Sequence, residues 1–330
     1  MRIFAVLVSV LLLAICSSPK RRPPRSTPDP YTTPVMDETR FVMRDGAVLP
    51  YLRWMPEGEA PWAVVIALHG INDSRAAFRL AGPWWAERGI ATYADDQRGF
   101  GDAPGAGLWP GDLMAQDLGQ VVALVRSRHP DALIAVAGES MGGAVAVTAF
   151  SSDAAPPADR LILLAPAVWG WSSQPLLYRF TLSAAAHTIG DVSLEPPEWA
   201  VDQVMPSDNL MELIRSGRDP DQSLSTRFDV LYGLVDLMEA AGQGLGDVGV
   251  PTLYLYGAHD DLVPDQAVQR ALRQAGPAPT LRTAFYEDGY HILNRDLQAV
   301  RVFADVEAWL RDEAAPLPSG AGPIPLRQGR

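Results

Sequence analysis

Residues 133–142 read Leu-Ile-Ala-Val-Ala-Gly-Glu-Ser-Met-Gly, and this stretch decides the fold. Its leading apolar residues predict a buried strand, and a helix-forming segment follows the last glycine. The glycines of the Gly-x-Ser-x-Gly pattern let the backbone turn sharply, so that Ser140 can stand above the sheet in a strained conformation. A serine on such a strand–turn–helix motif is a candidate nucleophile.

Strands and helices alternate on both sides of this motif. Short apolar runs predict strands at residues 41–44, 47–54, 63–68, 91–94, 161–165, 252–256 and 281–286. Helix-forming stretches predict helices at residues 75–88, 113–128, 140–151, 264–274 and 296–310. This alternation predicts an α/β fold with a mainly parallel, doubly wound sheet of about eight strands and helices on both faces.

The alternation stops between Pro166 and Val248, where the sequence has helical stretches and no convincing strand. This break predicts a helical cap inserted into the core, over the ends of the strands. Proline-rich stretches before and after the core predict a linker and a flexible tail. The expected division is a linker at 17–38, a core at 39–165 and 249–313, a cap at 166–248 and a tail at 314–330.

After Met1 and Arg2, an apolar segment runs from Ile3 to Cys16, and it is short for a bilayer span. Residues 1–16 therefore predict a signal peptide or a short membrane anchor. Leu13-Ala14-Ile15-Cys16 resembles a bacterial lipobox, in which Cys16 would be lipidated, but Ile15 departs from the small residue expected there. An uncleaved anchor with a chance cysteine is the alternative. Both interpretations predict an exported, membrane-tethered protein of the bacterial envelope.

The bulk composition is that of a globular enzyme. The 330 residues are 48% hydrophobic and 20% charged, with a net charge of −12. A surface this acidic argues against nucleic acid as a partner, because phosphate binding needs a basic face. The sequence contains neither a phosphate-binding loop nor a zinc-spaced Cys/His cluster, so we expect neither a cofactor nor a metal.

A serine hydroxyl needs a positioned base, and that base needs an orienting acid. With this motif the partners follow in the chain order Ser, acid, His. The histidines after Ser140 are His187, His259 and His291. His291 directly follows the last predicted strand, where a loop can bring its imidazole to the serine. It is therefore the expected general base, whereas His187 lies in the cap.

The expected acid is Asp260, which follows the predicted strand at residues 252–256. The carboxyl ends of the strands are where open α/β sheets place their sites. The preceding strand ends at Ala165 and has no carboxylate until Asp191, so the other common location is empty. Asp261 remains the alternative acid.

An oxyanion intermediate needs preorganised donors. The backbone N–H of Met141, at the start of the helix after the turn, is one expected donor. The backbone N–H of Ile71, in the loop after the strand at residues 63–68, is the other.

With these residues the chain resembles the α/β-hydrolases of the monoacylglycerol lipase and lysophospholipase group, whose relatives include serine aminopeptidase-like hydrolases. The resemblance spans about residues 41–310. It rests on His69-Gly70, Asp96-Gln97-Arg98-Gly99-Phe100-Gly101, Gly138-Glu139-Ser140-Met141-Gly142-Gly143, Gly257-x-x-Asp260-x-x-Val263-Pro264 and Tyr290-His291. Ile71 departs from the small residue common at its position, and its bulk is expected to narrow the oxyanion loop.

The resemblance implies an α/β-hydrolase fold and a serine carboxylic-ester hydrolase that forms an acyl-enzyme. The implied substrates are small molecules: monoacylglycerols, lysophospholipids or short-chain esters. The alternatives are an amide or peptide hydrolase, or an acyltransferase, with the same triad. A non-catalytic envelope scaffold is a further alternative of a different class.

The first part of the cap is rich in large apolar residues, which favours a pocket for an apolar acyl group. The residues expected to line this pocket are Trp169, Trp171, Leu177 and Phe180. The alternative is that these side chains only pack the cap onto the core.

Overall fold

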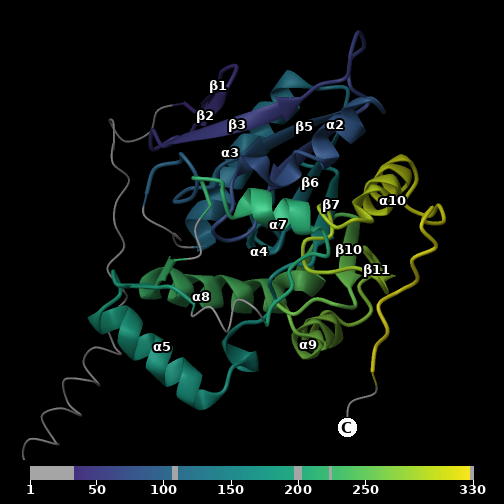
Figure 1. Cartoon of the computed structure of the whole chain (residues 1–330). Coiled ribbons are helices and arrows are strands. Elements are labelled where there is room, and N and C mark those ends of the chain that lie inside the picture. Colours follow the sequence, from purple (N-terminus) through teal and green to yellow (C-terminus); the bar gives the residue numbers. More distant parts are fainter. Residues whose placement is uncertain (1–32, 106–110, 197–202, 223–224, 328–330) are drawn as a thin grey trace, which may run out of the picture.

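The computed structural model describes residues 33–105, 111–196, 203–222 and 225–327, and its centre is a nine-stranded sheet (Figure 1). The strand order is β1-β2-β3-β5-β4-β6-β7-β10-β11. The strands are β1 (Val35–Met36), β2 (Arg40–Val42), β3 (Val48–Trp54), β4 (Ala63–Leu68), β5 (Ile90–Asp95), β6 (Leu133–Glu139), β7 (Arg160–Leu164), β10 (Thr252–Gly257) and β11 (Leu281–Tyr286). The six strands from β5 to β11 are parallel, and β1, β2 and β3 are added antiparallel at one edge.

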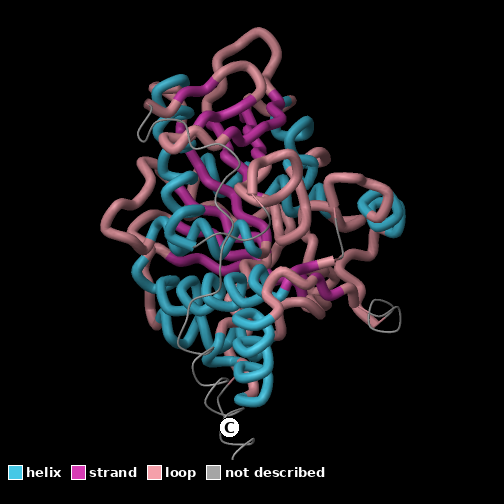
Figure 2. Tube along the Cα trace, turned by 90° about the vertical axis from the view of Figure 1, so that its left-hand side faces the viewer, coloured by secondary structure: helices cyan, strands magenta, loops and turns pink. Residues whose placement is uncertain are grey.

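The parallel strands are apolar along their whole length because both faces of the sheet are covered. In β4, Val64 and Ile66 face one apolar cluster while Val65 and Ala67 face the other, as the two-residue period of a strand requires. Helices lie on both sides of the strands (Figure 2). The sheet and its doubly wound character are as predicted, and they set the carboxyl ends of β4, β6, β7, β10 and β11 along one edge.

The two helical layers differ in size. One face is covered by α2 (Ala81–Ala86) and α10 (Ala299–Arg311), whose Trp85 and Trp309 are fully buried. The other face is covered by α3 (Gly111–Arg128), α4 (Met141–Phe150), α8 (Phe228–Gly244) and α9 (Asp265–Ala275). Because α8 packs on α4, part of the inserted segment belongs to the layer on the sheet.

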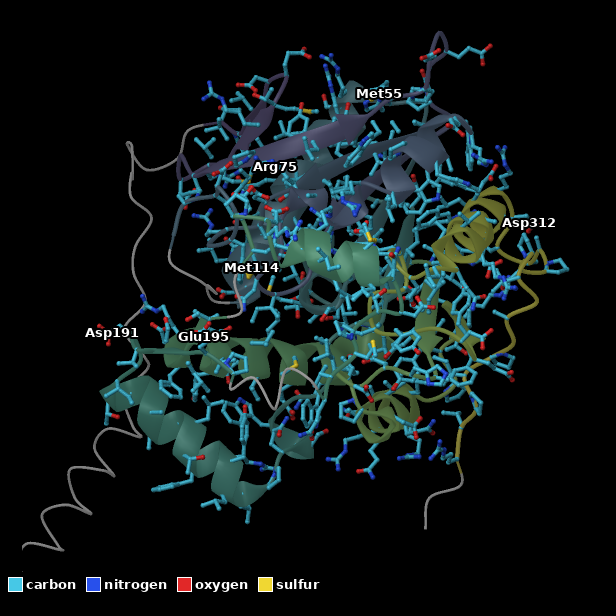
Figure 3. The ribbon with its side chains drawn as sticks, viewed as in Figure 1. Met55, Arg75, Met114, Asp191, Glu195 and Asp312 are labelled. Atoms are coloured by element: carbon cyan, nitrogen blue, oxygen red, sulfur yellow. The ribbon has the colours of Figure 1, made fainter. Side chains whose placement is uncertain are left out.

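The inserted segment also contains α5 (Leu176–Thr188), which packs on the outer side of α8, and α7 (Leu210–Ser216). Asp191 and Glu195 lie at the outer end of this cap, where α5 leads into β8 (Figure 3). Strands β8 (Ser193–Leu194) and β9 (Thr226–Arg227) pair with each other. These two-residue strands were not predicted, because they are too short to show a periodic pattern.

The helix predicted at residues 75–88 is divided in the structure. A 3-10 turn, η1 (Arg75–Phe78), is followed by the separate helix α2. Pro83 explains the division, because it lacks the N–H that a continuous helix would donate to the carbonyl of Arg79. In the first turn of α2 that N–H is not needed.

The core begins earlier in the chain than predicted. β1 lies inside the predicted linker at residues 17–38, so that linker is shorter than expected. The signal peptide or anchor at residues 1–16, with Cys16, lies outside the described residues. Within the described residues, no helix has the length and apolar character needed to cross a membrane.

The C-terminal segment differs from the loose tail that was predicted. Over residues 314–327 it lies along β11, where the Phe285 N–H donates to the Gly322 carbonyl at 2.8 Å. Leu317 and Ile324 anchor the segment, each only 5% exposed. Its proline and glycine content is compatible with this extended course, and the segment shields an edge strand that would otherwise present unpaired backbone groups.

A prediction follows from the contact between α4 and β4. A Cβ added at Gly142 would lie 2.5 Å from the backbone oxygen of Leu68, so Gly142→Ala must displace backbone. We expect the free energy of unfolding to fall by about 1–3 kcal/mol, as measured by chemical denaturation. Gly119→Ala in α3 is the matched control, because nothing lies within 4 Å of its added Cβ. There alanine should raise stability by up to about 1 kcal/mol. A stability loss in both variants would contradict the packing argument.

Candidate active site

Ser140 occupies the turn between β6 and α4. Its backbone has φ 52° and ψ −114°, a conformation that side-chain-bearing residues rarely adopt. The Ser140 N–H donates to the Leu164 carbonyl at 3.0 Å, and the Ser140 carbonyl accepts from the Ala167 N–H at 2.9 Å. These bonds fix the turn against the end of β7, while the serine side chain remains partly exposed.

Strain is concentrated at this edge of the sheet. Among the described residues, the non-glycine residues with positive φ are Asn72, Ser140 and Ala165. They follow β4, β6 and β7, which are neighbours in the sheet. Backbone strain of this kind persists only where surrounding structure holds it, and it gathers at functional sites.

His291 and Asp260 lie side by side next to this turn. His291 Nδ1 is 2.8 Å from Asp260 Oδ2, and both side chains are buried. Asp260 follows β10 and His291 follows β11, so their pairing results from the adjacency of these strands. Asp260 Oδ1 accepts from the backbone N–H groups of Leu262 and Val263, at 2.9 and 2.8 Å, which fixes the carboxylate.

The electrostatics of the pair suit a general base. Burial acts to lower the pKa of His291, but the charge and hydrogen bond of Asp260 outweigh it, and the pKa lies above its ordinary value. Glu139 adds to this upward shift. If Nδ1–H donates to Asp260, Nε2 is the nitrogen that can accept a proton. The alternative acid Asp261 is exposed and has no such contact with His291.

Ser140 and His291 line one pocket of about 320 Å³. Ile71 lines it too, whereas Met141 is fully buried at the start of α4. The backbone N–H groups of Ile71 and Met141 remain the predicted oxyanion donors.

Of the four cap residues predicted to line the pocket, one does so. Trp169 lines the pocket. Trp171 instead donates from Nε1 to Asp236 Oδ1 at 2.6 Å, outside the pocket lining. Leu177 and Phe180 point away from the core, with 74% and 47% of their surface exposed, so their prediction as pocket residues is wrong. Both lie on α5, of which Tyr178 is the residue that reaches the pocket.

The apolar wall of the pocket comes mainly from α8, which sequence reasoning missed. The residues are Leu231, Leu234, Val235 and Met238. They are spaced i, i+3, i+4 and i+7, so helical periodicity could have shown that they share one face. What the pattern could not show is that this face meets Ser140.

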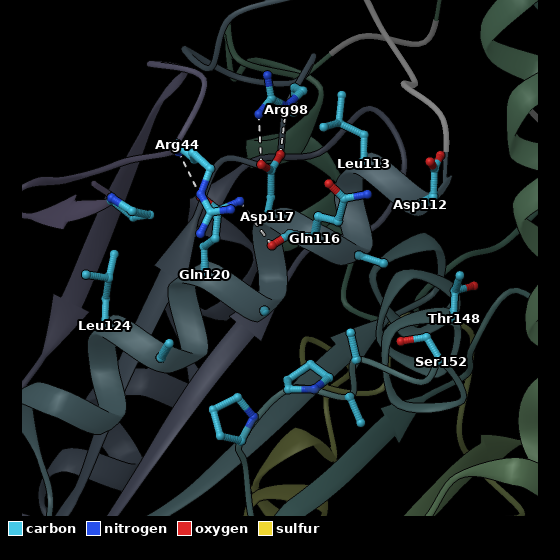
Figure 4. A pocket seen from close by; sticks show the side chains of 18 of the residues that line it. Arg44, Arg98, Asp112, Leu113, Gln116, Asp117, Gln120, Leu124, Thr148 and Ser152 are labelled. Atoms are coloured by element: carbon cyan, nitrogen blue, oxygen red, sulfur yellow. Dashed lines mark hydrogen bonds and ion pairs between the residues drawn. The ribbon is translucent and has the colours of Figure 1, made fainter. Parts of the chain in front are cut away.

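A larger cavity of about 1200 Å³ runs along α3 and contains neither Ser140 nor His291 (Figure 4). Arg98, Asp117 and Gln120 lie on its wall, and Arg98 is paired with Asp117 at 2.7 Å. By volume alone, this larger cavity would be chosen as the active site. It lacks a nucleophile–base pair, however, so we place the candidate active site at Ser140. Nowhere in the described ranges do three or more His, Cys, Asp or Glu side chains gather to hold a metal ion.

Comparison with known proteins shows the family of the chain and solved structures with a similar fold. Residues 59–298 match the family described as serine aminopeptidase, S33. Over 311 residues the chain is 24% identical to the monoglyceride lipase of Mus musculus, covering 92% of this chain and all of that protein. A soluble variant of the Saccharomyces cerevisiae monoglyceride lipase superposes with a TM-score of 0.67 at 17% identity, covering 87% of this chain and 98% of the other. The Paleococcus ferrophilus monoacylglycerol lipase gives 0.65 at 17% identity, covering 79% and 98%.

Proposed function

The chain belongs to the serine aminopeptidase S33 family of α/β-hydrolases, and from this premise we propose that it is a carboxylic-ester hydrolase with Ser140 as nucleophile, His291 as general base and Asp260 as orienting acid. The observation that carries the proposal is the buried His291–Asp260 pair, whose imidazole lines the same pocket as the strained Ser140.

In the first half of the reaction, Ser140 Oγ attacks the ester carbonyl while His291 Nε2 takes its proton. The negative charge that develops on the carbonyl oxygen is stabilised by the backbone N–H groups of Ile71 and Met141. The bond from the carbonyl carbon to the alcohol oxygen then breaks, and the imidazolium returns the proton to the leaving alcohol. In the second half, His291 activates a water that releases the acid and restores Ser140.

The pocket supports an apolar acyl group. The α8 side chains, together with Trp169 and Tyr178, give one wall without a charged group. A volume of about 320 Å³ is at the lower end of the usual range for small-molecule sites and suits a single acyl chain. A monoacylglycerol, a lysophospholipid or a short-chain ester fits this description, and the relatives named above favour the first.

An aminopeptidase activity is the main alternative within this family. It would need a free carboxylate in the pocket to bind a substrate ammonium group. The carboxylates that line the pocket are Asp73 and Glu139, and both are paired with Arg295, at 2.7 and 2.6 Å. This pairing favours an ester over a peptide with a charged N-terminus.

The test is a set of p-nitrophenyl esters of graded chain length, compared with aminoacyl p-nitroanilides. We expect ester hydrolysis with an optimum in acyl length, little anilide hydrolysis, and covalent labelling by a fluorophosphonate probe. Preference for the anilides would favour the peptidase. If the protein reacts with none of the esters and is not labelled by the probe, the non-catalytic scaffold remains as the alternative.

A further inference from the structure

One arginine on the segment of the proposed base, His291, contacts the loop of Ile71 and the turn of Ser140. Arg295 lies four residues after His291 and is 2% exposed. Its Nη2 is 2.7 Å from Asp73 Oδ2 and 2.6 Å from Glu139 Oε1. Asp73 lies two residues after Ile71 in the predicted oxyanion loop, and Glu139 directly precedes Ser140.

We propose that Arg295 is a positioning residue for the ester hydrolysis proposed above, on which this inference rests: its guanidinium sets the loops of Ser140, Ile71 and His291 in register with one another. The strands β4, β6 and β11 that precede these loops are not all neighbours in the sheet, since β7 and β10 lie between β6 and β11. Ladder hydrogen bonds therefore do not join the base loop directly to the other two.

The surrounding contacts fix the cluster from several sides. Asp73 Oδ1 accepts from the side-chain amide of Gln222 at 2.5 Å, which ties the oxyanion loop to the cap segment. The carbonyl of Arg295 accepts from the side-chain amide of Asn209 at 3.0 Å.

A buried cluster of one cation and two carboxylates is costly to desolvate, and an apolar substitute is often at least as stable. Its presence on the pocket wall therefore favours a role beyond stability. Burial acts to raise the pKa of Asp73, but Arg295 outweighs it, and the pKa lies below its ordinary value. The charge of Glu139 in turn raises the pKa of His291, which Arg295 opposes. The cluster thus acts on the base electrostatically as well as through geometry.

Two variants separate geometry from charge. Arg295→Lys keeps the positive charge, but its ammonium ends one bond short of Nη2 and cannot hold both carboxylates without movement of the loops. We expect kcat to fall by about tenfold or more, with KM within about twofold and the acid limb of the pH–rate profile unmoved. Glu139→Gln keeps the shape and an acceptor for Arg295 but removes the charge. We expect the acid limb of kcat/KM to move to lower pH.

Arg98→Lys is the matched control. Arg98 is also buried, 1% exposed, and also bridges two carboxylates, Asp117 and Asp45, but it does not line the pocket that contains Ser140. This variant should lose thermal stability while keeping kcat within about twofold of wild type. An equal fall in kcat for Arg98→Lys and Arg295→Lys, or an unchanged kcat in Arg295→Lys, would overturn the inference.

Direct titration of His291 by histidine NMR keeps this test separate from the proposed function. The chain has five histidines, and comparison with a His291→Gln variant assigns the resonance. The pKa of His291 should be lower in Glu139→Gln than in wild type, whether or not any ester is hydrolysed. A wild-type protein inactive on every ester would refute the proposed function alone. An unchanged His291 pKa in Glu139→Gln would refute the electrostatic part of the inference, and an unchanged kcat in Arg295→Lys would refute the positioning part.

Discussion

Ser140→Ala should abolish ester hydrolysis, with kcat on the order of 10⁶-fold below wild type. The loss should be this large because the serine oxygen forms the covalent intermediate, and His291 and Asp260 contribute little without it. Steady-state turnover of the preferred p-nitrophenyl ester measures the effect, and fluorophosphonate labelling should disappear in parallel. The fold should be unchanged, since alanine occupies the φ of 52° no less readily than serine.

Ser152→Ala controls for the loss of a hydroxyl. Ser152 lies just beyond the other end of α4, and its Oγ donates to the Ala149 carbonyl at 2.8 Å. This variant should keep wild-type activity and labelling. Equal activity of Ser140→Ala and wild type would refute the nucleophile assignment.

Asp260→Asn should lower kcat by about 10⁴-fold. The amide oxygen can still accept from the Leu262 and Val263 N–H groups, so the loop should stay in place. The amide nitrogen, however, would face His291 Nδ1 and favour the tautomer whose proton is on Nε2. That tautomer cannot take the proton from Ser140, which explains the size of the expected effect.

The same variant should also shift the pH dependence of activity in a defined direction. The base must be neutral, so activity is lost as the pH falls through the pKa of His291. Asp260 holds this pKa above its ordinary value, and Asp260→Asn should therefore move the acid limb of kcat/KM to lower pH while the maximum falls. Asp261→Asn is the control and should leave both unchanged, because Asp261 is exposed. If Asp261→Asn lowers the maximum and shifts the acid limb while Asp260→Asn changes neither, Asp261 is the acid.

The sequence was most informative where a local pattern has one structural solution. The apolar run before Gly138 and the strands before Asp260 and His291 predict a sheet whose carboxyl ends share one edge, and the structure has this sheet. The pairing of His291 with Asp260 followed from the chain order that accompanies the motif around Ser140.

The sequence was least informative where tertiary packing chooses among equivalent surfaces. Leu177 and Phe180 have the composition of an acyl pocket, but α5 turns them outward. The spacing of apolar residues in α8 predicts that they share one helix face, but it does not predict which part of the protein that face contacts. Arg295 could not be identified, because its two partners come from loops more than 150 and 220 residues earlier in the chain. Nothing local distinguishes it from the other arginines.

The position of α8 has a consequence for how substrate preference can change in this protein. Val235 and Met238 border the proposed acyl pocket and are also buried in the cluster that joins α8 to α4. A smaller side chain at either position would accommodate a longer acyl chain and at the same time leave a cavity against the helix that carries Ser140. Selection on substrate range and selection on folding therefore act on the same side chains. New specificities should arise through compensating pairs of substitutions in α8 and α4 rather than through single steps.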